Sequence, residues 1–224
     1  MTFSIVARTP DARCFGVAIA SSSPAVAARC AHARAAAGAV ATQNITDPAL
    51  GPIILERLST GAGADAAIAS AMAGTPFAAF RQVLAIGAHG PPVIHSGAGT
   101  LGLVGSAVGP DAAAAGNLLS HADVPDAMIA AFEAADGHLG GRLLHALRAG
   151  LDRGGEAGPV HSAGLLVVRE VSWPIVDLRV DWTDGDAVSD LQRIWEIYAP
   201  QIDAYVQRAL DPGRAPGFGM PCDP

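Results

Sequence analysis

A threonine stands second in the sequence, in the opening stretch MTFSIVART. A threonine hydroxyl is a weak nucleophile by itself, but at a free chain start the α-amine of the same residue can act as its base, with an ordinary pKa of roughly 7.7–8.0. Because the initiator methionine is usually removed when the second side chain is small, Met1 followed by Thr2 permits this arrangement. The alternative is that Thr2 is an ordinary threonine at the start of a strand.

Three other motifs that carry chemistry are incomplete. Gly97, Gly99 and Gly102 have the spacing of a dinucleotide-binding loop, but glycine and proline follow where a helix should begin. No H-E-x-x-H or C-x-x-C pattern occurs, and His138 and His145 stand on a Leu-rich stretch. The G-x-S-x-G sequence of many serine hydrolases is also missing. We therefore predict no cofactor and no metal.

The cysteines and the hydropathy bear on the compartment. Cys14, Cys30 and Cys222 are odd in number and irregularly spaced, which argues against a disulfide framework and for a reducing compartment. The sequence has no basic segment followed by an apolar signal stretch, and no apolar run of the roughly 18–20 residues that a membrane span needs. We expect a cytoplasmic protein without a membrane segment.

The charge pattern excludes further classes. The formal net charge is -7, and all 14 basic residues are arginines that occur singly. No basic stripe is present to neutralise a phosphate backbone, so we do not expect nucleic-acid binding. The absence of lysine also removes a Schiff-base lysine and a lysine base from the possible catalytic groups.

Short apolar runs predict a hairpin near the start of the chain, from Phe3 to Ala7 and over FGVAIASS. A third strand is predicted at GAVATQ, and the stretch before it, PAVAARCAHARAAA, fits either a short helix or an irregular crossing. Two short helices are predicted next, over ILERL after Pro52 and over AAIASAMAG after Asp65.

The second half of the chain repeats this order. RQVLAIGA and PPVIHSG predict two strands, and a glycine-rich segment leads to AAAAGNLL. SAGLLVVRE and PIVDLRVD supply two more strands, and a last helix is interrupted at Pro200. Between these strands, two amphipathic helices are predicted on the periodic residues Val124, Ala127, Met128, Ala131, Phe132 and Ala135, and then Leu139, Leu143, Leu144, Leu147 and Leu151.

Elements grouped by type predict an α+β fold with antiparallel sheets, because a doubly wound parallel sheet would alternate strand and helix singly. Half of the 224 residues are hydrophobic, which suits a single domain, and we place it at residues 1–210. Residues 211–224 are predicted to be a disordered tail. Scarce aromatic and apolar residues gather on the last helix and suit a homodimer, or else a face that caps the core: Trp195, Tyr198, Ile202 and Tyr205.

Several stretches stand in a fixed order along the chain: MTFSIVART, FGVAIASSSPAVAARCAHARAAAGAVATQN, GPIILERLSTG, RQVLAIG, the AGNLL segment and SAGLLVVRE. Together they closely resemble the family called domain of unknown function 1028, which is similar to N-terminal-nucleophile (Ntn) hydrolases. The resemblance covers roughly residues 1–195, which is nearly the whole predicted domain.

The resemblance implies a four-layer αββα sandwich, as in proteasome β subunits, whose first strand presents its N-terminal residue at the cleft between the sheets. It implies that Thr2 is the nucleophile of an amide-bond hydrolase, with its own amine taking the hydroxyl proton and returning it to the leaving group. Ser21 and Ser22 would bond the amine or the substrate, and Asn117 with the backbone of Gly116 would form an oxyanion hole.

The sequence departs from proteasome-type relatives in two places. It has no aspartate after the second strand, where the serines stand, and no lysine, so Arg29 or Arg34 would have to take the place of the lysine. Further candidates for the cleft stand at predicted strand ends: Gln43, Asn44, His161 and Ser162.

Two functions remain open at this point. The first is an Ntn-type hydrolase of an amide or peptide-like small substrate, with Thr2 as nucleophile. The second is a non-catalytic member of the same fold that binds a small ligand in the inter-sheet cleft or serves as an assembly scaffold. The intact Met-Thr start favours the first function, and the missing lysine and aspartate favour the second.

Overall fold

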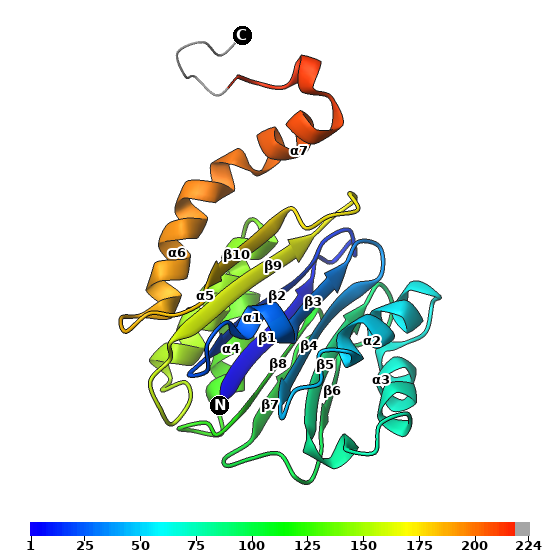
Figure 1. Ribbon diagram of the computed structural model, residues 1–224, viewed down its shortest axis with the longest axis vertical. Coiled ribbons are helices and arrows are strands. Elements are labelled where there is room, and N and C mark those ends of the chain that lie inside the picture. The colour runs from blue at the N-terminus through cyan, green and yellow to red at the C-terminus, as the bar shows by residue number, and fades with distance from the viewer. Residues whose placement is uncertain (218–224) are drawn as a thin grey trace.

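Two antiparallel β-sheets form the centre of the molecule (Figure 1) in a computed structural model that describes residues 1–217. The larger sheet has six strands in the order β10-β9-β2-β1-β8-β7. Phe3 on β1 lies opposite Ala20 on β2, and Thr2 lies opposite Asn117 on β8. The start of the chain is therefore held between paired strands. The bounds are β1 Thr2–Arg8, β2 Phe15–Ser21, β7 Gly105–Val108, β8 Ala112–Asn117, β9 Ser162–Val168 and β10 Val176–Val180.

The smaller sheet has four strands in chain order, β3-β4-β5-β6. They are β3 (Ala31–Arg34), β4 (Gly38–Asn44), β5 (Arg81–Gly87) and β6 (Val93–Ser96). This sheet faces the larger one, with β4 and β5 lying against β1. Strand β3 stands first in this order and pairs with β4, so among residues 1–217 its other side is a sheet edge.

The helices cover the two sheets in pairs. Helices α4 (Val124–Ala134) and α5 (Leu139–Asp152) pack on β8 and on β1 and β2, respectively. Helices α2 (Leu50–Ser59) and α3 (Ala64–Ala73) pack on β4 and on β5 and β6. The short helix α1 (Val26–Cys30) contacts strands of both sheets, including β2 and β4.

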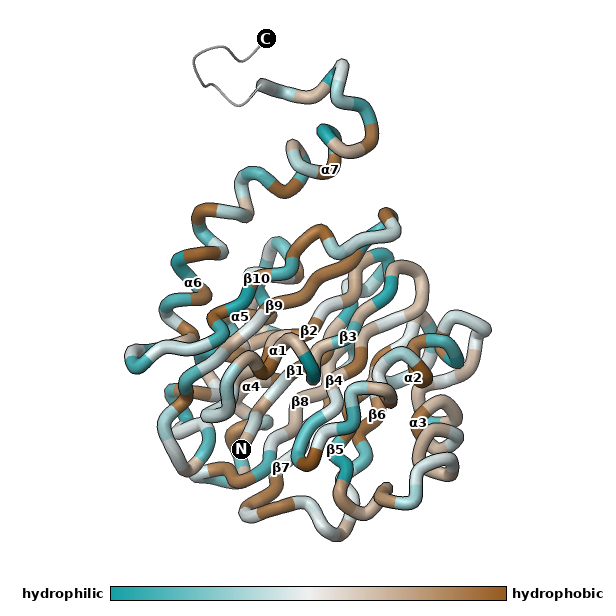
Figure 2. Tube along the Cα trace, in the orientation of Figure 1, coloured by the Kyte–Doolittle hydropathy of each residue, from teal (hydrophilic) through white to brown (hydrophobic). Residues whose placement is uncertain are grey.

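Two C-terminal helices complete the fold. Helix α6 (Ala187–Tyr198) packs beside α5, β9 and β10, and α7 (Ile202–Leu210) follows after a 3₁₀ turn at Ala199–Gln201. In Figure 1, α6 runs alongside β10 and β9, and α7 lies beyond the end of the sheets. Figure 2 shows hydrophobic and hydrophilic residues alternating along them, as expected for amphipathic helices. Among the helices of residues 1–217, none has both the length and the apolar character of a membrane-spanning helix.

Side chains alternate along β1 between two environments. Phe3 and Ile5 belong to the core formed with α4 and α5, whereas Val6 belongs to the layer between the sheets and Ser4 bonds Gln43 on the smaller sheet. Toward the end of β1 this inter-sheet layer is apolar, and toward its beginning the layer is built from polar side chains. The polar end coincides with the start of the chain.

The structure confirms the α+β fold with antiparallel sheets, the first hairpin and both helix pairs. The undecided stretch PAVAARCAHARAAA contains α1 and the edge strand β3, and the four-residue strand β7 was not predicted. The predicted break at Pro200 is a 3₁₀ turn, and α7 follows it. Part of the predicted tail, Pro212–Arg214, forms a 3₁₀ turn, while residues 218–224, including Cys222, lie outside the described residues.

Candidate active site

Thr2 begins β1 at the polar end of the layer between the sheets. It is 6% exposed, whereas Met1 is 37% exposed and lies beside Gly158, where an added Cβ would be 3.0 Å from Met1 Cε. Register places Asn117 directly opposite Thr2. The pairing of β1 with its neighbours thus holds the buried threonine in one orientation, next to the exposed Met1.

The hydroxyl of Thr2 has a second hydroxyl beside it. Thr2 Oγ1 lies 3.3 Å from Ser21 Oγ, and both hydroxyls donate to the carbonyl oxygen of Met1. Loss of Met1 would remove this shared acceptor and leave the α-amine of Thr2 next to both hydroxyls. The structure therefore brings together two of the residues that the resemblance had singled out.

A chain of serines continues from Ser21 toward β9. Ser21 Oγ lies 2.9 Å from Ser23 Oγ, and Ser162 Oγ donates to the carbonyl oxygen of Ser23 at 2.7 Å. The backbone N–H of His161 donates to the carbonyl of Ser21 at 2.9 Å. Ser162 and His161 therefore hold the end of β2 in place, and neither side chain makes a hydrogen bond with Thr2.

Behind Thr2 the two sheets are joined by a buried network of amides. Gln82 Oε1 accepts from Gln43 Nε2 at 2.8 Å and from Asn117 Nδ2 at 3.1 Å. Ser4 Oγ donates to Gln43 Oε1 at 2.7 Å, and Gln82 Nε2 donates to Ser96 Oγ at 3.0 Å. The side-chain oxygen of Asn117 has no hydrogen-bond partner although the residue is fully buried. The amide of Asn117 thus keeps unused hydrogen-bonding capacity beside Thr2.

Sequence reasoning missed Glu156, which is buried at the same end of the sheet. It is 3% exposed, and neither carboxyl oxygen makes a hydrogen bond of normal geometry. Burial raises the pKa of this carboxyl to about 7, against the opposing effects of the N-terminal amine, Ser22 and His161. In the sequence Glu156 is one acidic residue in a glycine-rich loop, and nothing there marks it as buried.

Three residues near the site have a left-handed backbone conformation, which residues other than glycine rarely adopt. They are Ala25 (φ 49°), Asn44 (φ 71°) and Leu118 (φ 51°). Asn44 directly follows Gln43, and Leu118 directly follows Asn117. Two further residues, Ala12 and Ala36, adopt the same conformation in the turns between β1 and β2 and between β3 and β4, so it also occurs at ordinary turns.

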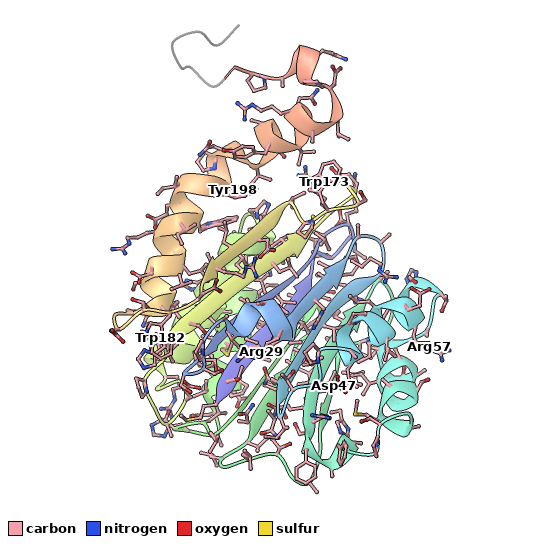
Figure 3. The ribbon with its side chains drawn as sticks, viewed as in Figure 1. Arg29, Asp47, Arg57, Trp173, Trp182 and Tyr198 are labelled. Carbon is pink, nitrogen blue, oxygen red and sulfur yellow. The ribbon has the colours of Figure 1, made fainter. Side chains whose placement is uncertain are left out.

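Arg29 and Arg34, the candidates to take the place of the missing lysine, bond residues other than Thr2. Arg29 donates to Ser23 Oγ at 2.8 Å and to the carbonyl oxygens of Pro24 and Ala25, on the α1 side of the site (Figure 3). Arg34 forms an ion pair with Glu56 at 2.7 Å on the smaller sheet. Arg29 thus reaches the site only through Ser23.

The remaining candidates have structural surroundings of their own. Asn44 joins two loops, since its Nδ2 donates to the carbonyl of Phe80 and its Oδ1 accepts from the backbone of Leu101. Gly116 lies within β8 with paired strands on both sides, and its carbonyl accepts from Gln82 Nε2 at 3.2 Å. Ser22 lies next to Glu156. Of these three, only Ser22 contacts a buried group without another partner.

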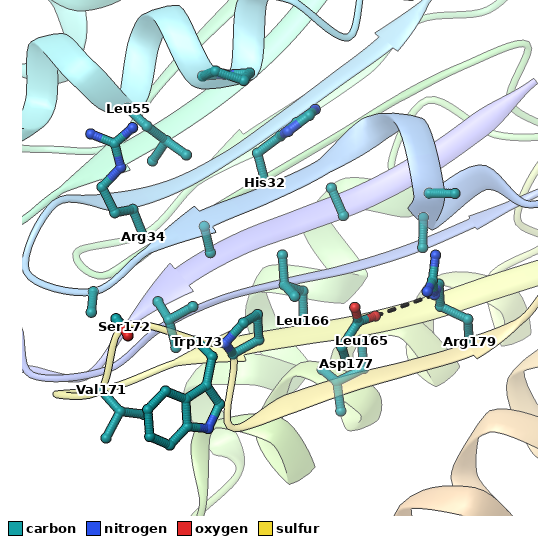
Figure 4. A pocket seen from close by; sticks show the side chains of 18 residues that line it. His32, Arg34, Leu55, Leu165, Leu166, Val171, Ser172, Trp173, Asp177 and Arg179 are labelled. Atoms are coloured by element: carbon teal, nitrogen blue, oxygen red, sulfur yellow. Dashed lines mark ion pairs between the residues drawn. The ribbon is translucent and has the colours of Figure 1, made fainter.

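A groove of about 730 Å³ lies away from Thr2, between β3 with α1 and α2 on one side and the β9–β10 hairpin on the other (Figure 4). His32, Leu166 and Trp173 line it, together with Arg34 and Arg179. Arg179 pairs with Asp177 at 3.3 Å. Burial lowers the pKa of His32, so its ring is neutral at physiological pH. The groove is therefore a mixed apolar and polar surface along an open sheet edge.

Within residues 1–217 no group of three or more His, Cys, Asp or Glu side chains is placed to hold a metal ion. The glycine-rich segment at Gly97 and Gly99 is a loop whose amides donate to the carbonyl oxygens of Arg81 and Ala79. These amides are therefore not directed at a phosphate.

The fold and the site define an α+β protein of two antiparallel sheets with buried hydroxyls, amides and one carboxyl around its first residues. The family model described as "Family of unknown function (DUF1028)" matches residues 2–191, and the chain belongs to this family. A crystal structure of protein SPO2555 from Silicibacter pomeroyi, of the same family, is 28% identical, with a TM-score of 0.81 over 90% of this chain and 93% of that chain.

A second solved structure has a much weaker likeness. Anbu (ancestral beta-subunit) from Yersinia bercovieri is 11% identical, with a TM-score of 0.39, over 97% of this chain and 100% of that chain. None of the curated proteins matches the chain.

Proposed function

We propose that this protein is an Ntn-type hydrolase of an amide or peptide-like small substrate, with Thr2 as nucleophile after removal of Met1. The observation that carries the proposal is the position of the Thr2 hydroxyl, 3.3 Å from Ser21 Oγ at the polar end of the inter-sheet layer. A threonine at the first position of a strand brings its own base, so the absence of lysine does not prevent activation of the hydroxyl.

The proposed reaction needs no group beyond those at the site and water. Thr2 Oγ1 attacks the carbonyl carbon of the amide while its proton moves to the α-amine. The C–N bond then breaks, the ammonium gives its proton to the leaving amine, and an ester remains on Thr2. Water attacks this ester with the amine again as base, which releases the acid and restores the hydroxyl. The second N–H of the Asn117 amide is the candidate donor to the oxyanion.

We propose the four-layer αββα sandwich of Ntn hydrolases as the arrangement of the helix pairs and sheets, in a single domain over residues 1–210. The packing of α4 and α5 on one sheet and of α2 and α3 on the other supports this description. The facing of β4 and β5 toward β1 supports it as well.

The test begins with a chain whose first residue is Thr2, released from a cleavable N-terminal fusion. The probe is p-nitrophenyl acetate, an activated ester that acylates exposed nucleophiles. We expect a burst of p-nitrophenol and one added acetyl group on the N-terminal peptide by mass spectrometry. Thr2→Ala, which keeps the amine and loses the hydroxyl, should show no burst, and Thr2→Ser should retain it.

The same probe separates the nucleophile from its base. A chain that retains Met1 keeps the Thr2 hydroxyl but lacks the free amine, and we expect at least a hundredfold slower acylation from it. Equal acylation of the Thr2→Ala chain and the chain that begins with Thr2 would overturn the proposal. Amide substrates are then screened with the same set of variants.

The second candidate function is ligand binding without catalysis, and the groove beside β3 favours it. Its volume of about 730 Å³ falls within the usual range of small-molecule sites, roughly 300–1,000 Å³. Trp173 and His32 offer aromatic surfaces there, at a distance from the Thr2 site. A chain that binds small molecules but is never acylated at Thr2 would support this alternative.

We also propose a homodimer in the cytoplasm, formed through the C-terminal helices. Trp195 and Ile202 are packed in the core of their own chain, so the candidate contact consists of exposed neighbours. Ile197 is 70% exposed and Tyr205 is 41% exposed. The odd number of cysteines supports a reducing compartment.

A further inference from the structure

Glu156 is fixed in place by its backbone. It forms a bridge with Leu119, and the N–H of Ala157 donates to the carbonyl of Leu118 at 2.8 Å. Ser120 donates to the carbonyl of Gly155 from both its N–H, at 3.0 Å, and its hydroxyl, at 3.1 Å. Gly155 has φ +56°, a conformation that favours glycine. The loop that carries Glu156 is therefore tied to the residues that follow Asn117.

The position of the carboxyl follows from the order of the strands. Strand β1 lies between β2 and β8. Glu156 is anchored just beyond the end of β8, and its carboxyl interacts with the hydroxyl and the N–H of Ser22, just beyond the end of β2. The loop lies against the start of β1, because an added Cβ would be 3.3 Å from Phe3 Cε1 at Gly155 and 3.0 Å from Met1 Cε at Gly158. In this structure the charge at the chain start that acts on Glu156 is the α-amine of Met1.

A buried carboxylate is costly unless a positive group or hydrogen bonds compensate it. The groups whose charges favour ionisation of Glu156 are the N-terminal amine and His161 on the β9 side. His161 Nδ1 lies 2.7 Å from the carbonyl of Thr183 and 3.8 Å from Asp184 Oδ1, so that nitrogen is already directed elsewhere. Among residues 1–217, the carboxyl oxygens of Glu156 have no hydrogen-bond partner of normal geometry, and removal of Met1 would place the α-amine one residue further along the chain, on Thr2.

We propose that Glu156 is the positioning residue for the α-amine of Thr2: after Met1 is removed, its carboxylate binds the amine and stabilises the ammonium form. This inference rests on the proposed function, in which that amine takes the proton of the Thr2 hydroxyl. A carboxylate beside the amine raises the pKa of the amine and so makes it a stronger base. Glu156, in the loop between α5 and β9, would thus supply the negative charge that the serines after β2 do not carry.

The chain offers a clean way to test the pairing. It contains no lysine, so the α-amine is its single primary amine. Cyanate, a small reagent, carbamylates an amine only in its neutral form, and the mass of the N-terminal peptide reports the reaction of this amine separately from any reaction of the three cysteines. The rate as a function of pH therefore gives the pKa of this one group in the chain that starts at Thr2.

We expect the amine of the folded chain to titrate above its ordinary range of roughly 7.7–8.0. Glu156→Gln should lower its pKa by about one unit, which corresponds to a roughly tenfold larger neutral fraction at pH 7. Glu156→Asp should give an intermediate value. Glu133→Gln, at an exposed glutamate, should titrate like the parent chain.

Unfolding in urea supplies the reference for the free amine, so the test does not depend on Glu156→Gln folding well. The proposal would be overturned if the α-amine had the same pKa in the folded parent chain, in the unfolded parent chain and in folded Glu156→Asp. The measurement uses no substrate, so its outcome is separate from that of the acylation test. A raised pKa of the amine without acylation at Thr2 would support the pairing with Glu156 and reject the hydrolase. Acylation at Thr2 with an ordinary pKa of the amine would support the hydrolase and reject the pairing.

Discussion

The hydroxyl of Thr2 lies 3.3 Å from the hydroxyl of Ser21, and both donate to one acceptor, the carbonyl oxygen of Met1. Such closeness means that a change in one hydroxyl alters the environment of the other. If Thr2 is the nucleophile, Ser21 is the nearest group that can orient it.

Ser21→Ala in the chain that starts at Thr2 should slow acylation by p-nitrophenyl acetate roughly tenfold to a hundredfold, because the nucleophile loses a hydrogen-bonding neighbour. The burst rate measures this effect. Ser59→Ala is the control, since Ser59 is exposed and bonds only within its own helix. Unchanged acylation of Ser21→Ala would remove Ser21 from the mechanism.

Gln82→Met should destabilise the folded protein by about 2–4 kcal/mol, because Gln43 and Asn117 lose the oxygen that both donate to. Urea unfolding followed by circular dichroism gives the free energy. Gln192→Met is the matched control, since this glutamine bonds an exposed partner on α6. A loss no larger than that of the control would mean that water or rearrangement satisfies the two amides.

Glu156 makes the stability of the Met1-containing chain depend on pH. Its folded-state pKa is raised to about 7, above the ordinary value of roughly 4.3, so the unfolded state releases the proton first as the pH rises. The stability associated with this group is present below pH 4 and is lost progressively up to about pH 7.

The parent chain should therefore lose on the order of 2–3 kcal/mol relative to Glu156→Gln between pH 4 and pH 8. Urea titrations at pH 4, 5, 6, 7 and 8 on both proteins measure the difference. Parallel curves over this range would show that Glu156 ionises at its ordinary pH in the folded protein.

Ile197→Glu should convert the proposed homodimer to a monomer in analytical ultracentrifugation, because a charge would be placed on an apolar contact. A truncation after Pro200 would be a poorer test, since Ile202 and Val206 are part of the core. Gln192→Glu serves as the control on the same helix. Equal sedimentation of Ile197→Glu and the parent chain would exclude this contact.

Much of the fold was predictable because it follows local periodicity. The spacing of Val124, Met128 and Phe132 predicted α4, and all three are buried. Strand β3 was missed because Ala31–Arg34 has only four residues and lies at a sheet edge, where alternation is weak. Helix α7 was not predicted as a separate element because Pro200 signals only where a helix ends.

The site was predictable to the extent that residues stand at strand ends. Thr2, Ser21 and Asn117 come together because β1 pairs with both β2 and β8. The apolar runs predicted the hairpin of β1 with β2, the family resemblance implied the roles of the three residues, and the pairing of β1 with β8 was not predicted. Glu156 could not be predicted, since its burial arises from the hydrogen bonds of the 155–157 loop with residues 118–120. A single carboxylate in a loop reads as solvated until these long-range contacts are known.

The pairing of Thr2 with Asn117 also sets an order of events during synthesis. A nascent chain that begins at Met1 exposes its first residues long before Asn117 has left the ribosome, by an interval on the order of ten seconds at about 5–20 residues per second. Throughout that interval β8 does not exist, and the first strand has no partner on that side. An aminopeptidase thus meets the Met1–Thr2 bond in a flexible segment, whereas in the completed sheet the same bond joins a half-exposed residue to a buried one.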